Sequence, residues 1–546
     1  MYSKDLMSFS IESVENKSNY DDTLIKRIPQ YQNYIPIYDK FFTKNLNATL
    51  NYSKKIDRVE STDQHNKFIG KTLDNEKITM FAKFCPLMDP TKVLVGKENL
   101  QDKILPTQKS DIFSDENNSA YVDSFFSFLT SKMLHQHGFF HGLDCYGSLL
   151  AIQEDFRVDI QEDIEYLFES EYFLENRLNF NIKDEIYEQF EPVQSCKYKK
   201  KLLINDDDID IEVDKIDLQV EPIIDCSFDF KDCYNQNSDL VYIKQGNNNE
   251  KSKHSTNESS SSCSSRSSVT TGDEESMSES IDEDDYSSGS SLSDLQDRPI
   301  YATIKNYPVN MVFLESCEET LDEYMLNNDI NQEEWSSILM QIIMSLIVLQ
   351  EKFYFIHNDL HTSNVMYIPT DKQFLCYKYG ETHYKVPTFG KIWKIIDFGR
   401  AIYKFKGSVM FSDSFSEKGD ASTQYNCEPY LNPSKKIVPP NFSFDLCRLA
   451  CSLFDFFDEI EGLDAIKDLI DEWVKDDKGR NILYKNNGDE RYPDFKLYKM
   501  ITRSVHHLIP KDQLSNPLFS QYSVSRKNIR KNQFILKIDD IPSYVL

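Results

Sequence analysis

Two histidines, an aspartate and two asparagines crowd into the stretch HNDLHTSN, which runs from His357 to Asn364. The apolar run FYFI precedes it, and NVMYI continues with the composition of a strand. Side chains of these types accept protons, hold cations through oxygen or contact phosphate. A loop between two packed elements holds such groups rigidly at a surface. The sequence therefore predicts a chemical site here, with Asp359 at its centre.

A second polar position lies in KIWKIIDFGRA (391–401). We expect an apolar strand that stops at Asp397, with Gly399 supplying the backbone freedom that turns the carboxylate out of the strand. Asn364 and Asp397 are then expected on the ends of neighbouring strands. A third candidate is Lys83, which stands in MFAKFC on another expected strand.

Phosphoryl transfer uses this set of groups. A carboxylate orients the attacking hydroxyl and takes its proton, an amide oxygen and a second carboxylate hold Mg²⁺, and a lysine grips the phosphates. Asp359 fits the first role, and Lys83 fits the last. Asn364 and Asp397 fit the role of metal ligands, because hard cations prefer oxygen.

The surrounding pattern predicts elements that position these groups. Apolar residues recur at helical spacing in SAYVDSFFSFLTSKMLHQ (119–136), whereas LDCYGSLLAI and PVNMVFLES are typical of strands. TLDEYM predicts a short helix. NQEEWSSILMQIIMSLIVLQEKF predicts a long one with a single apolar stripe, and Asn331 with Glu334 resembles a capping box. Strands are therefore expected mainly before residue 205 and helices mainly after residue 298, which indicates an α+β fold.

At this point a family resemblance is visible. HNDLHTSN resembles the catalytic loop of protein kinases, and IIDFGRA resembles their metal-binding DFG segment. The wider pattern, from about Lys67 to Phe519, is similar to serine/threonine kinases of mimivirus-type giant DNA viruses; it includes FAKFCPLMDP, AYVDSFFSFLTSKML, HGLDCYGSLLAI, ESCEETLDEYM and RYPDFKLYKMI. The resemblance implies a bilobal kinase-like fold, with an N-terminal lobe of mainly antiparallel sheet and one long helix, and a mainly helical C-terminal lobe. It also implies ATP and Mg²⁺ as cofactors, and serine or threonine hydroxyls of a protein as the acceptor.

The resemblance also assigns roles to single residues. It makes Asp359 the catalytic base, Asn364 and Asp397 the Mg²⁺ ligands, and Lys83 the lysine that holds the nucleotide phosphates. The remaining implied residues either line the adenine site or support the catalytic groups: Leu314 as gatekeeper with Glu315 and Cys317 in the hinge, Asp123 as the carboxylate partner of Lys83, Asp445 as the brace of the catalytic loop, His357 packed under that loop, and His361 and Gly399 beside it.

Four features depart from the kinase pattern. Gly70 is the one glycine before Lys83 where kinases carry a glycine-rich loop, and CEPYLNP is a weak echo of the usual APE anchor. His361 stands where many kinases carry lysine. Asn358 replaces an arginine that normally receives a phosphorylated activation loop. We therefore expect control by activation-loop phosphorylation to be absent.

Three alternatives remain beside a protein kinase. HNDLHTSN with IDFG also resembles small-molecule phosphotransferases of the aminoglycoside and choline kinase type, which often carry histidine where His361 stands. The missing glycine loop suggests a catalytically weak pseudokinase scaffold. His357 and His361 suggest zinc, although the residues between them do not form the helical HExxH pattern. Because every group needed to handle metal and proton is present, an active enzyme is favoured.

Charge and composition narrow the class of protein. The net charge of −29 argues against a nucleic-acid partner, because phosphates are repelled. More than half of that charge lies between residues 205 and 298, where 24 acidic residues face 7 basic ones. The 11 cysteines show no paired metal-type spacing, which suggests a reducing compartment. With no signal-peptide pattern and no apolar run long enough for a membrane span, we expect a soluble intracellular protein, in the host cytoplasm or virion if it is viral.

These observations predict how the chain is divided. The Ser/Asp/Glu-rich segment lacks apolar periodicity and cannot offset its ordering entropy, so we expect it to be a disordered insert. The oligomeric state and the identity of the protein substrate stay open. The expected segments are an N-terminal extension (1–66), the first part of the N-lobe (67–204), the insert (205–298), the end of the N-lobe with the hinge (299–317), the C-lobe (318–522) and a basic C-terminal tail (523–546). Within this tail, we expect the run SVSRKNIRKNQFILK to be a solvated face.

Overall fold

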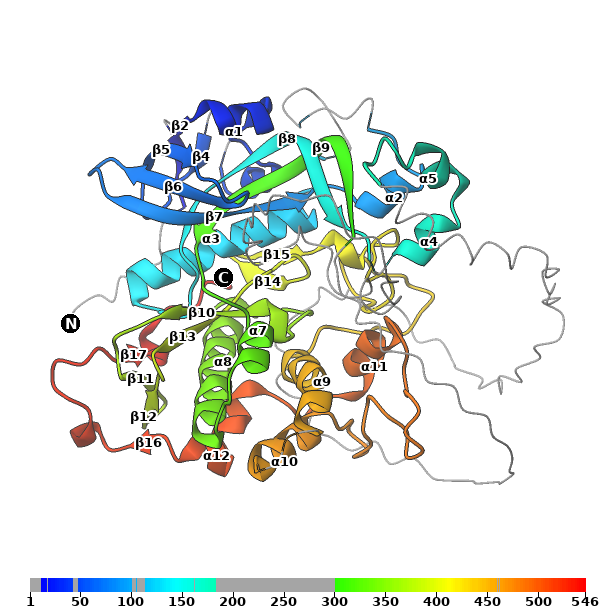
Figure 1. The fold of residues 1–546 in the computed structure, drawn as a ribbon. Helices are drawn as coiled ribbons and strands as arrows, with labels where there is room; N and C mark the ends of the chain where they lie inside the picture. Colours follow the sequence, from blue (N-terminus) through cyan, green and yellow to red (C-terminus); the bar gives the residue numbers. More distant parts are fainter. Residues whose placement is uncertain are drawn as a thin grey trace, which may run out of the picture.

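The computed structural model describes residues 11–16, 18–42, 48–100, 105, 113–161, 163–182, 300–458, 460 and 462–546. Within them the fold is mixed α+β, as predicted (Figure 1). The predicted insert (205–298) lies outside the described residues.

A curled seven-stranded sheet forms the part of the molecule that holds Lys83. Its strand order is β2-β5-β6-β7-β9-β8-β3, and every neighbouring pair is antiparallel except β2 with β5. Three of its strands precede residue 67, so much of the N-terminal extension belongs to this sheet. The strands are β2 (Asn19–Tyr20), β3 (Gln30–Gln32), β5 (Ile56–Ser61), β6 (Lys67–Thr72), β7 (Lys77–Pro86), β8 (Cys145–Asp159) and β9 (Tyr301–Glu315).

One face of the sheet packs on the long helix α3 (Ser119–His137), which lies where the sequence predicts a helix. Asn118 caps its first turn by accepting from the Ala120 N–H, and Gly138 ends it in the left-handed region at φ 67°. The other face is covered by short helices: α1 (Asp22–Arg27), α2 (Pro90–Leu94), α4 (Ile164–Phe168) and α5 (Glu171–Asn176). A two-stranded sheet of β1 (Ser13–Glu15) and β4 (Ala48–Leu50) and the 3-10 turn η1 (Pro36–Lys40) complete this part.

The second part is built around helix α8 (Gln332–Phe353). The residues of the predicted apolar stripe are all buried, and serines and glutamines on the other faces, including Ser337 and Gln341, are buried as well. Asn331 caps the helix, but Glu334 makes no reciprocal capping bond; it accepts instead from the Tyr324 hydroxyl. Around α8 stand α7 (Leu321–Asn327), α9 (Phe444–Asp458), α10 (Asp464–Trp473), α11 (Lys496–Ser504) and α12 (Pro517–Ser520).

Helix α8 is long and apolar enough to cross a membrane, but 94% of its apolar window is buried inside the molecule. This burial is what the core helix of a soluble protein shows. Within the described residues, no other helix passes the same test of length and composition.

More strands follow the predicted insert than the sequence led us to expect. β10 (Val365–Pro369) pairs with β13 (Lys391–Ile395), and β14 (Ile402–Phe405) forms a hairpin with β15 (Ser408–Phe411). A four-stranded sheet of order β16-β12-β11-β17 lies beside α8. Its strands are β11 (Phe374–Tyr379), β12 (Thr382–Pro387), β16 (Ser523–Val524) and β17 (Leu536–Lys537).

The basic run 523–537 is mostly exposed, as predicted, whereas several residues that follow it are packed into the molecule. β17 pairs with β11, and Ile538, Tyr544 and Val545 are buried. The Tyr544 ring stacks on Phe353 at the end of α8, with 5.3 Å between centroids. The apolar residues at the end of the tail therefore continue the core, while the basic run 526–531 stays mostly at the surface.

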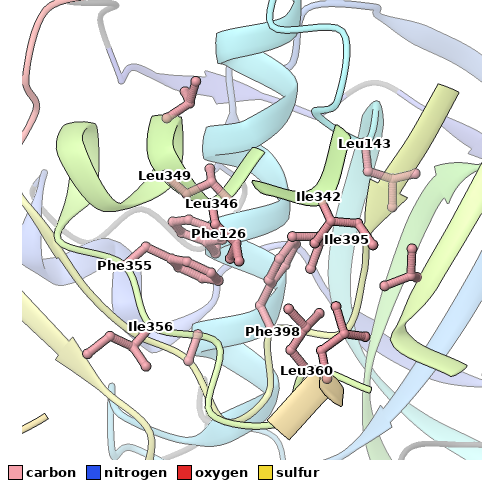
Figure 2. Packing of buried hydrophobic residues seen from close by; sticks show 14 of the residues in the cluster. Phe126, Leu143, Ile342, Leu346, Leu349, Phe355, Ile356, Leu360, Ile395 and Phe398 are labelled. Carbon is pink, nitrogen blue, oxygen red and sulfur yellow. The ribbon is translucent and has the colours of Figure 1, made fainter. Parts of the chain in front are cut away.

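The core between α3 and the second part is aromatic. Phe126 of α3 stacks on Phe355 at 4.5 Å and meets Phe398 edge-on at 4.8 Å (Figure 2). Leu360 and Ile395 belong to the same cluster. Aromatic pairs of this kind stabilise a fixed geometry beyond their buried area. The packing therefore sets α3, the 357–364 loop and the 396–399 segment against one another.

Candidate active site

Lys83, Asp123 and Asp397 form one ion-pair network. The Lys83 Nζ lies 2.8 Å from the Asp123 Oδ2 and 2.9 Å from the Asp397 Oδ1. The three residues come from β7, α3 and the segment after β13, and their side chains are largely buried. Burial alone lowers the pKa of Lys83, but the two carboxylates outweigh it and raise that pKa well above its ordinary value. The lysine is therefore held as a cation between two anions.

Asp123 also fixes the segment that follows Asp397. Its Oδ1 accepts a hydrogen bond from the Phe398 N–H at 2.9 Å, while its Oδ2 faces Lys83. One carboxylate thus bridges the sheet and the 396–399 segment. The aspartate side chain is long enough for both contacts.

The backbone turn at the second polar position differs from the prediction. Asp397 itself adopts the left-handed conformation, with φ 62°, whereas Gly399 does not. The Gly399 N–H donates to the Asp397 Oδ1 at 3.3 Å. Aspartate is one of the few side chains that tolerate this region. The prediction that Gly399 provides the unusual backbone conformation is therefore wrong. The left-handed conformation of Asp397 itself turns its carboxylate out of the strand.

Asn364 and Asp397 lie side by side, as predicted from the strands. β10 and β13 are antiparallel with Val365 opposite Ile395, and the Ile396 N–H donates to the Asn364 carbonyl at 3.0 Å. Asn364 ends the short 3-10 turn η7 (Thr362–Asn364). Its side-chain amide nitrogen donates to the Asp359 carbonyl at 2.9 Å and lies 3.1 Å from the His361 Nε2. The amide oxygen is left to face another group.

The loop that carries Asp359 is held in place by hydrogen bonds to helix α9. Asp445 of α9 is buried, and its two oxygens accept from the His357 N–H at 2.9 Å and the Asn358 N–H at 3.0 Å. Burial raises the pKa of Asp445, and the hydrogen bonds and neighbouring charges offset part of that rise. The His357 ring donates from Nε2 to the Ile396 carbonyl, so its Nδ1 accepts from the Asp359 N–H at 3.2 Å. The loop is therefore bonded to both α9 and the segment after β13.

Asp359 itself is enclosed. Its Oδ1 accepts from the Tyr498 hydroxyl at 2.7 Å, and its Oδ2 lies 3.6 Å from the Arg400 Nη1. Burial on its own raises the pKa of Asp359, but the charges of Arg400 and Arg448 and the Tyr498 hydrogen bond outweigh it, so the pKa is lowered overall. Beside it, burial lowers the pKa of His361 to about 4. At neutral pH, Asp359 is thus ionised and His361 is uncharged.

The predicted adenine-site residues lie at the end of β9. Leu314 faces Phe81 and Cys145 across the sheet. Glu315 forms an ion pair with the buried Lys394 of β13 at 2.5 Å. Within the described chain, the Cys317 N–H donates no hydrogen bond, which leaves one backbone donor open at this position.

Four further residues of the site carry no role in the sequence interpretation. Tyr498 and Arg400 touch Asp359, Arg448 touches Tyr498, and Lys394 ties Glu315 to β13. RYPDFKLYKMI contributed only to the resemblance, and nothing in its spacing indicates a contact across 139 positions. The sequence does carry a signal for Arg400, because an arginine directly after an apolar strand and a carboxylate requires a partner when it is buried.

The residues that follow Arg400 tie down the helix that carries Asp123. The Tyr403 hydroxyl donates to the Val122 carbonyl at 3.0 Å. Asp413 accepts from the Ser119 N–H at 2.8 Å, and its own N–H donates to the Asn117 carbonyl at 2.8 Å. The amino end of α3 is therefore attached to the β14–β15 segment by direct hydrogen bonds.

Asp413 makes stability depend on pH. Burial raises the pKa of its carboxyl from 3.8 to about 7, and the nearby Asp115 and Asp420 add to this. Between these pH values the folded state binds a proton that the unfolded state has lost, so stability falls as pH rises from about 4 to 7. Asp413→Asn keeps an acceptor for Ser119 and cannot ionise. We expect it to remove this fall, raising stability above pH 7 by up to a few kcal/mol at about 1.4 kcal/mol per pKa unit.

Urea unfolding at pH 5 and pH 8.5 measures this effect. The exposed Asp468 of α10 provides a control, since Asp468→Asn should leave the pH dependence unchanged. An Asp413→Asn protein whose stability falls with pH as steeply as that of the parent contradicts the assignment.

Within the part of the chain that the structure describes, neither a zinc-type cluster nor the cavity near the N-terminal strands is built from the predicted site residues. Among the described residues, no group of three His, Cys, Asp or Glu side chains is placed to hold a metal, so His357 and His361 have no third ligand of a zinc type. A cavity of about 390 Å³ lies between the N-terminal strands and the sheet, lined by Tyr20, Tyr146 and Phe313 among others. None of the predicted site residues lines it.

Comparison with known proteins gives partial matches. No protein-family model matches the chain. It is 32% identical over 114 residues to a probable serine/threonine-protein kinase of Dictyostelium discoideum, and 26% identical over 100 residues to a probable kinase of Invertebrate iridescent virus 3. An uncharacterised Caenorhabditis elegans protein is 24% identical over 106 residues.

The matches cover 18–19% of this chain and 9%, 19% and 36% of the three proteins, respectively. Over about a fifth of its length, the chain is therefore similar to proteins named as probable kinases. None of the three comes from a mimivirus-type virus, so that finer resemblance stays a prediction. These names indicate phosphoryl transfer in general and leave the acceptor open.

Proposed function

We propose that this protein transfers the γ-phosphoryl group of ATP to serine or threonine hydroxyls of proteins. The observation that carries the proposal is the buried network of Lys83, Asp123 and Asp397. It places one cation and two anions from three separate elements within hydrogen-bonding distance. A lysine that is oriented by one carboxylate and stands beside a metal-binding carboxylate is the arrangement that phosphoryl transfer in kinases requires.

The proposed nucleotide site lies between the sheet and the second part, which we interpret as the two lobes of a kinase-like fold. Lys83 would hold the phosphates, and Leu314 would limit the depth of the adenine site. The backbone of Glu315 and Cys317 would form the polar edge of the adenine site. The Cys317 N–H, which donates no hydrogen bond within the described chain, would serve as a donor to the adenine base. Gly70, which packs on Met80, is the one glycine in β6 and β7, so these two strands supply no glycine-rich loop for the phosphates.

The donor set next to Lys83 fits Mg²⁺. Asn364 uses its amide nitrogen for Asp359 and His361, which directs the amide oxygen away from the loop. The Asp397 carboxylate stands on the adjacent segment, and both oxygens are ligands that suit a hard cation. When bound, Mg²⁺ would neutralise charge on the phosphates.

Asp359 is the proposed base. Its low pKa keeps it ionised. It can therefore orient an acceptor hydroxyl and accept the proton of that hydroxyl as the phosphoryl group is transferred. His361 is neutral at pH 7 and therefore does not supply the positive charge of the lysine found in many kinases. Lys83 remains the cation nearest to the proposed metal ligands.

His361 is also the observation that favours a second candidate, a small-molecule phosphotransferase of the aminoglycoside or choline kinase type. A competition between phosphate acceptors distinguishes the two proposed functions. A serine/threonine peptide library, choline and an aminoglycoside are offered together with labelled ATP. Label on the peptides supports the protein kinase, and label confined to choline or the aminoglycoside overturns it. Binding of ATP without transfer to any acceptor would favour the scaffold.

Activity should not depend on phosphorylation of the chain. Asn358 is fully buried, its amide nitrogen donates to the Arg400 carbonyl at 2.9 Å, and its oxygen accepts from Tyr425. It therefore has no free group for a phosphate, and α3 is already attached through Asp413. We expect phosphatase-treated protein to keep its rate within about twofold. A large loss that maps to a phosphate between residues 400 and 440 contradicts this.

Deleting residues 247–296 should preserve turnover. The described chain on either side of the undescribed residues is joined near the start of β9, where the Thr303 N–H donates to the Phe180 carbonyl at 2.8 Å. Leu314 lies at the other end of this strand, on the order of 40 Å away at about 3.3 Å per residue. The closure entropy of a loop changes only with the logarithm of its length. Loss of the folded state on deletion, seen by thermal unfolding, would show that the segment is packed.

A further inference from the structure

The hydroxyl of Tyr498 has a fixed direction. The Arg448 Nε lies 2.9 Å from the Tyr498 hydroxyl oxygen, and an arginine can only donate. The hydroxyl therefore accepts from Arg448 and uses its one proton to donate to the Asp359 Oδ1 at 2.7 Å. The chain Arg448–Tyr498–Asp359 runs from α9 through α11 to the loop.

The ring of Tyr498 has little freedom to move. It stacks on Phe495 with 5.3 Å between centroids and is buried. The guanidinium groups of Arg448 and Arg400 lie 5.1 Å and 5.6 Å from its centroid. Cation–π contacts in a desolvated setting are among the stronger polar contacts of an aromatic ring. The hydroxyl is therefore held in place by packing as well as by its hydrogen bonds.

The two oxygens of Asp359 are consequently different. Oδ1 is used by Tyr498, whereas Oδ2 is buried and makes no hydrogen bond. The nearest cationic atom is the Arg400 Nη1 at 3.6 Å, and it likewise makes no hydrogen bond. The acceptor Oδ2 and the donor Nη1 thus lie next to each other, and neither makes a hydrogen bond. One hydroxyl group satisfies both, because it donates to a carboxylate and accepts from a guanidinium.

We propose that Tyr498, held by Arg448, is a positioning residue that occupies Oδ1 of Asp359 and so reserves Oδ2, together with the Arg400 Nη1, for the acceptor hydroxyl. The inference rests on the proposed function, because it names the contacts of the hydroxyl at the same base. Tyr498 acts on the reaction through Asp359 alone. Entry of the hydroxyl requires the closed contact between Oδ2 and Arg400 to open.

Tyr498→Phe removes the hydroxyl and keeps the ring. The carboxylate of Asp359 then loses a donor to its charged form, so its pKa should rise. Because the base must be ionised, the acidic limb of kcat/KM should move to higher pH. A carboxylate free to rotate should also lower kcat about 10–100-fold, with the KM for ATP unchanged.

Tyr484→Phe is the matched control. Tyr484 also donates to a carboxylate, Asp455, at 2.9 Å, but that pair is exposed. This variant should leave kcat and the pH profile unchanged. A Tyr498→Phe protein that loses stability and rate with an unmoved acidic limb would show a structural role only, and would overturn the proposal.

A second readout does not need activity. The carboxyl pKa of Asp359 is followed by ¹³C NMR in the full chain labelled at aspartate carboxyl carbons, with Asp359→Asn assigning the signal. We expect a higher pKa in Tyr498→Phe than in the parent, and equal values refute the proposal. If the parent transfers no phosphate while this pKa still shifts, the proposed function fails and the contact of Tyr498 with Asp359 stands.

Discussion

Asp359→Asn is expected to lower kcat by about 10²–10⁴-fold, the usual effect of removing a general base. This corresponds to about 3–5 kcal/mol of barrier. The asparagine keeps an oxygen for the Tyr498 hydroxyl, so the loop should retain its position. It cannot take a proton from the acceptor. The affinity for ATP should change little, because Lys83, Asn364 and Asp397 remain.

The measurement is single-turnover transfer of γ-phosphate to a peptide, beside calorimetric titration with ATP. Thermal unfolding serves as a control, because the variant removes a buried charge beside Arg400, whose other carboxylate partner is Asp420. Equal rates for parent and variant, with both proteins folded and saturated with ATP, contradict the role of Asp359.

The second large effect is expected at Asp397. Loss of an outer-shell partner of a bound metal costs about 10–100-fold, so loss of a direct ligand in Asp397→Ala should lower transfer by more than about 10²-fold. Raising the Mg²⁺ concentration should restore part of the rate if Asn364 still binds the ion. Lys83 loses one carboxylate but keeps Asp123, which preserves the cation.

Initial rates across a Mg²⁺ series, with EDTA at its lower end, test this. Asp371→Ala supplies a matched surface control, since Asp371 is exposed after β10. Full activity of the parent protein in EDTA excludes the metal role. So does an Asp397→Ala protein whose Mg²⁺ dependence is the same as that of the parent.

Local pattern was sufficient to predict the main elements that hold the site. The apolar spacing of 119–136 marks α3, and the β-rich runs mark β7 and β9. The pairing of Asp123 with Lys83 was implied by the resemblance to kinases, and it forms because α3 covers the sheet that carries Lys83. The juxtaposition of Asn364 and Asp397 followed from two strands that each end at a polar residue.

Errors arose where the physical cause was not local. The apolar stripe of α8 gave no sign that its polar residues are buried too, and these bond to neighbouring strands; Gln341 accepts from the Trp393 N–H at 3.1 Å. Tyr544 sits in a basic tail, yet it fills the core beside Phe353. At Asp397 the usual preference of glycine for positive φ was applied to the wrong residue, because aspartate also reaches this region.

The contacts of Asp359 could not be predicted from spacing at all. Tyr498 and Arg448 stand in helices that follow the loop by many residues, and only the packing of α9 and α11 brings them to the carboxylate. A buried arginine in an apolar helix does require a partner. Which partner it finds depends on the whole arrangement of helices.

Transfer of labelled γ-phosphate from Mg²⁺-ATP to a serine/threonine peptide library, by the parent and by Asp359→Asn side by side, tests the central claim most directly. The account predicts label on serine or threonine in the parent reaction, its loss without Mg²⁺, and a rate about 10²–10⁴-fold lower in the variant. The account is contradicted if no peptide is labelled by the parent, or if Asp359→Asn labels the peptides as fast as the parent does.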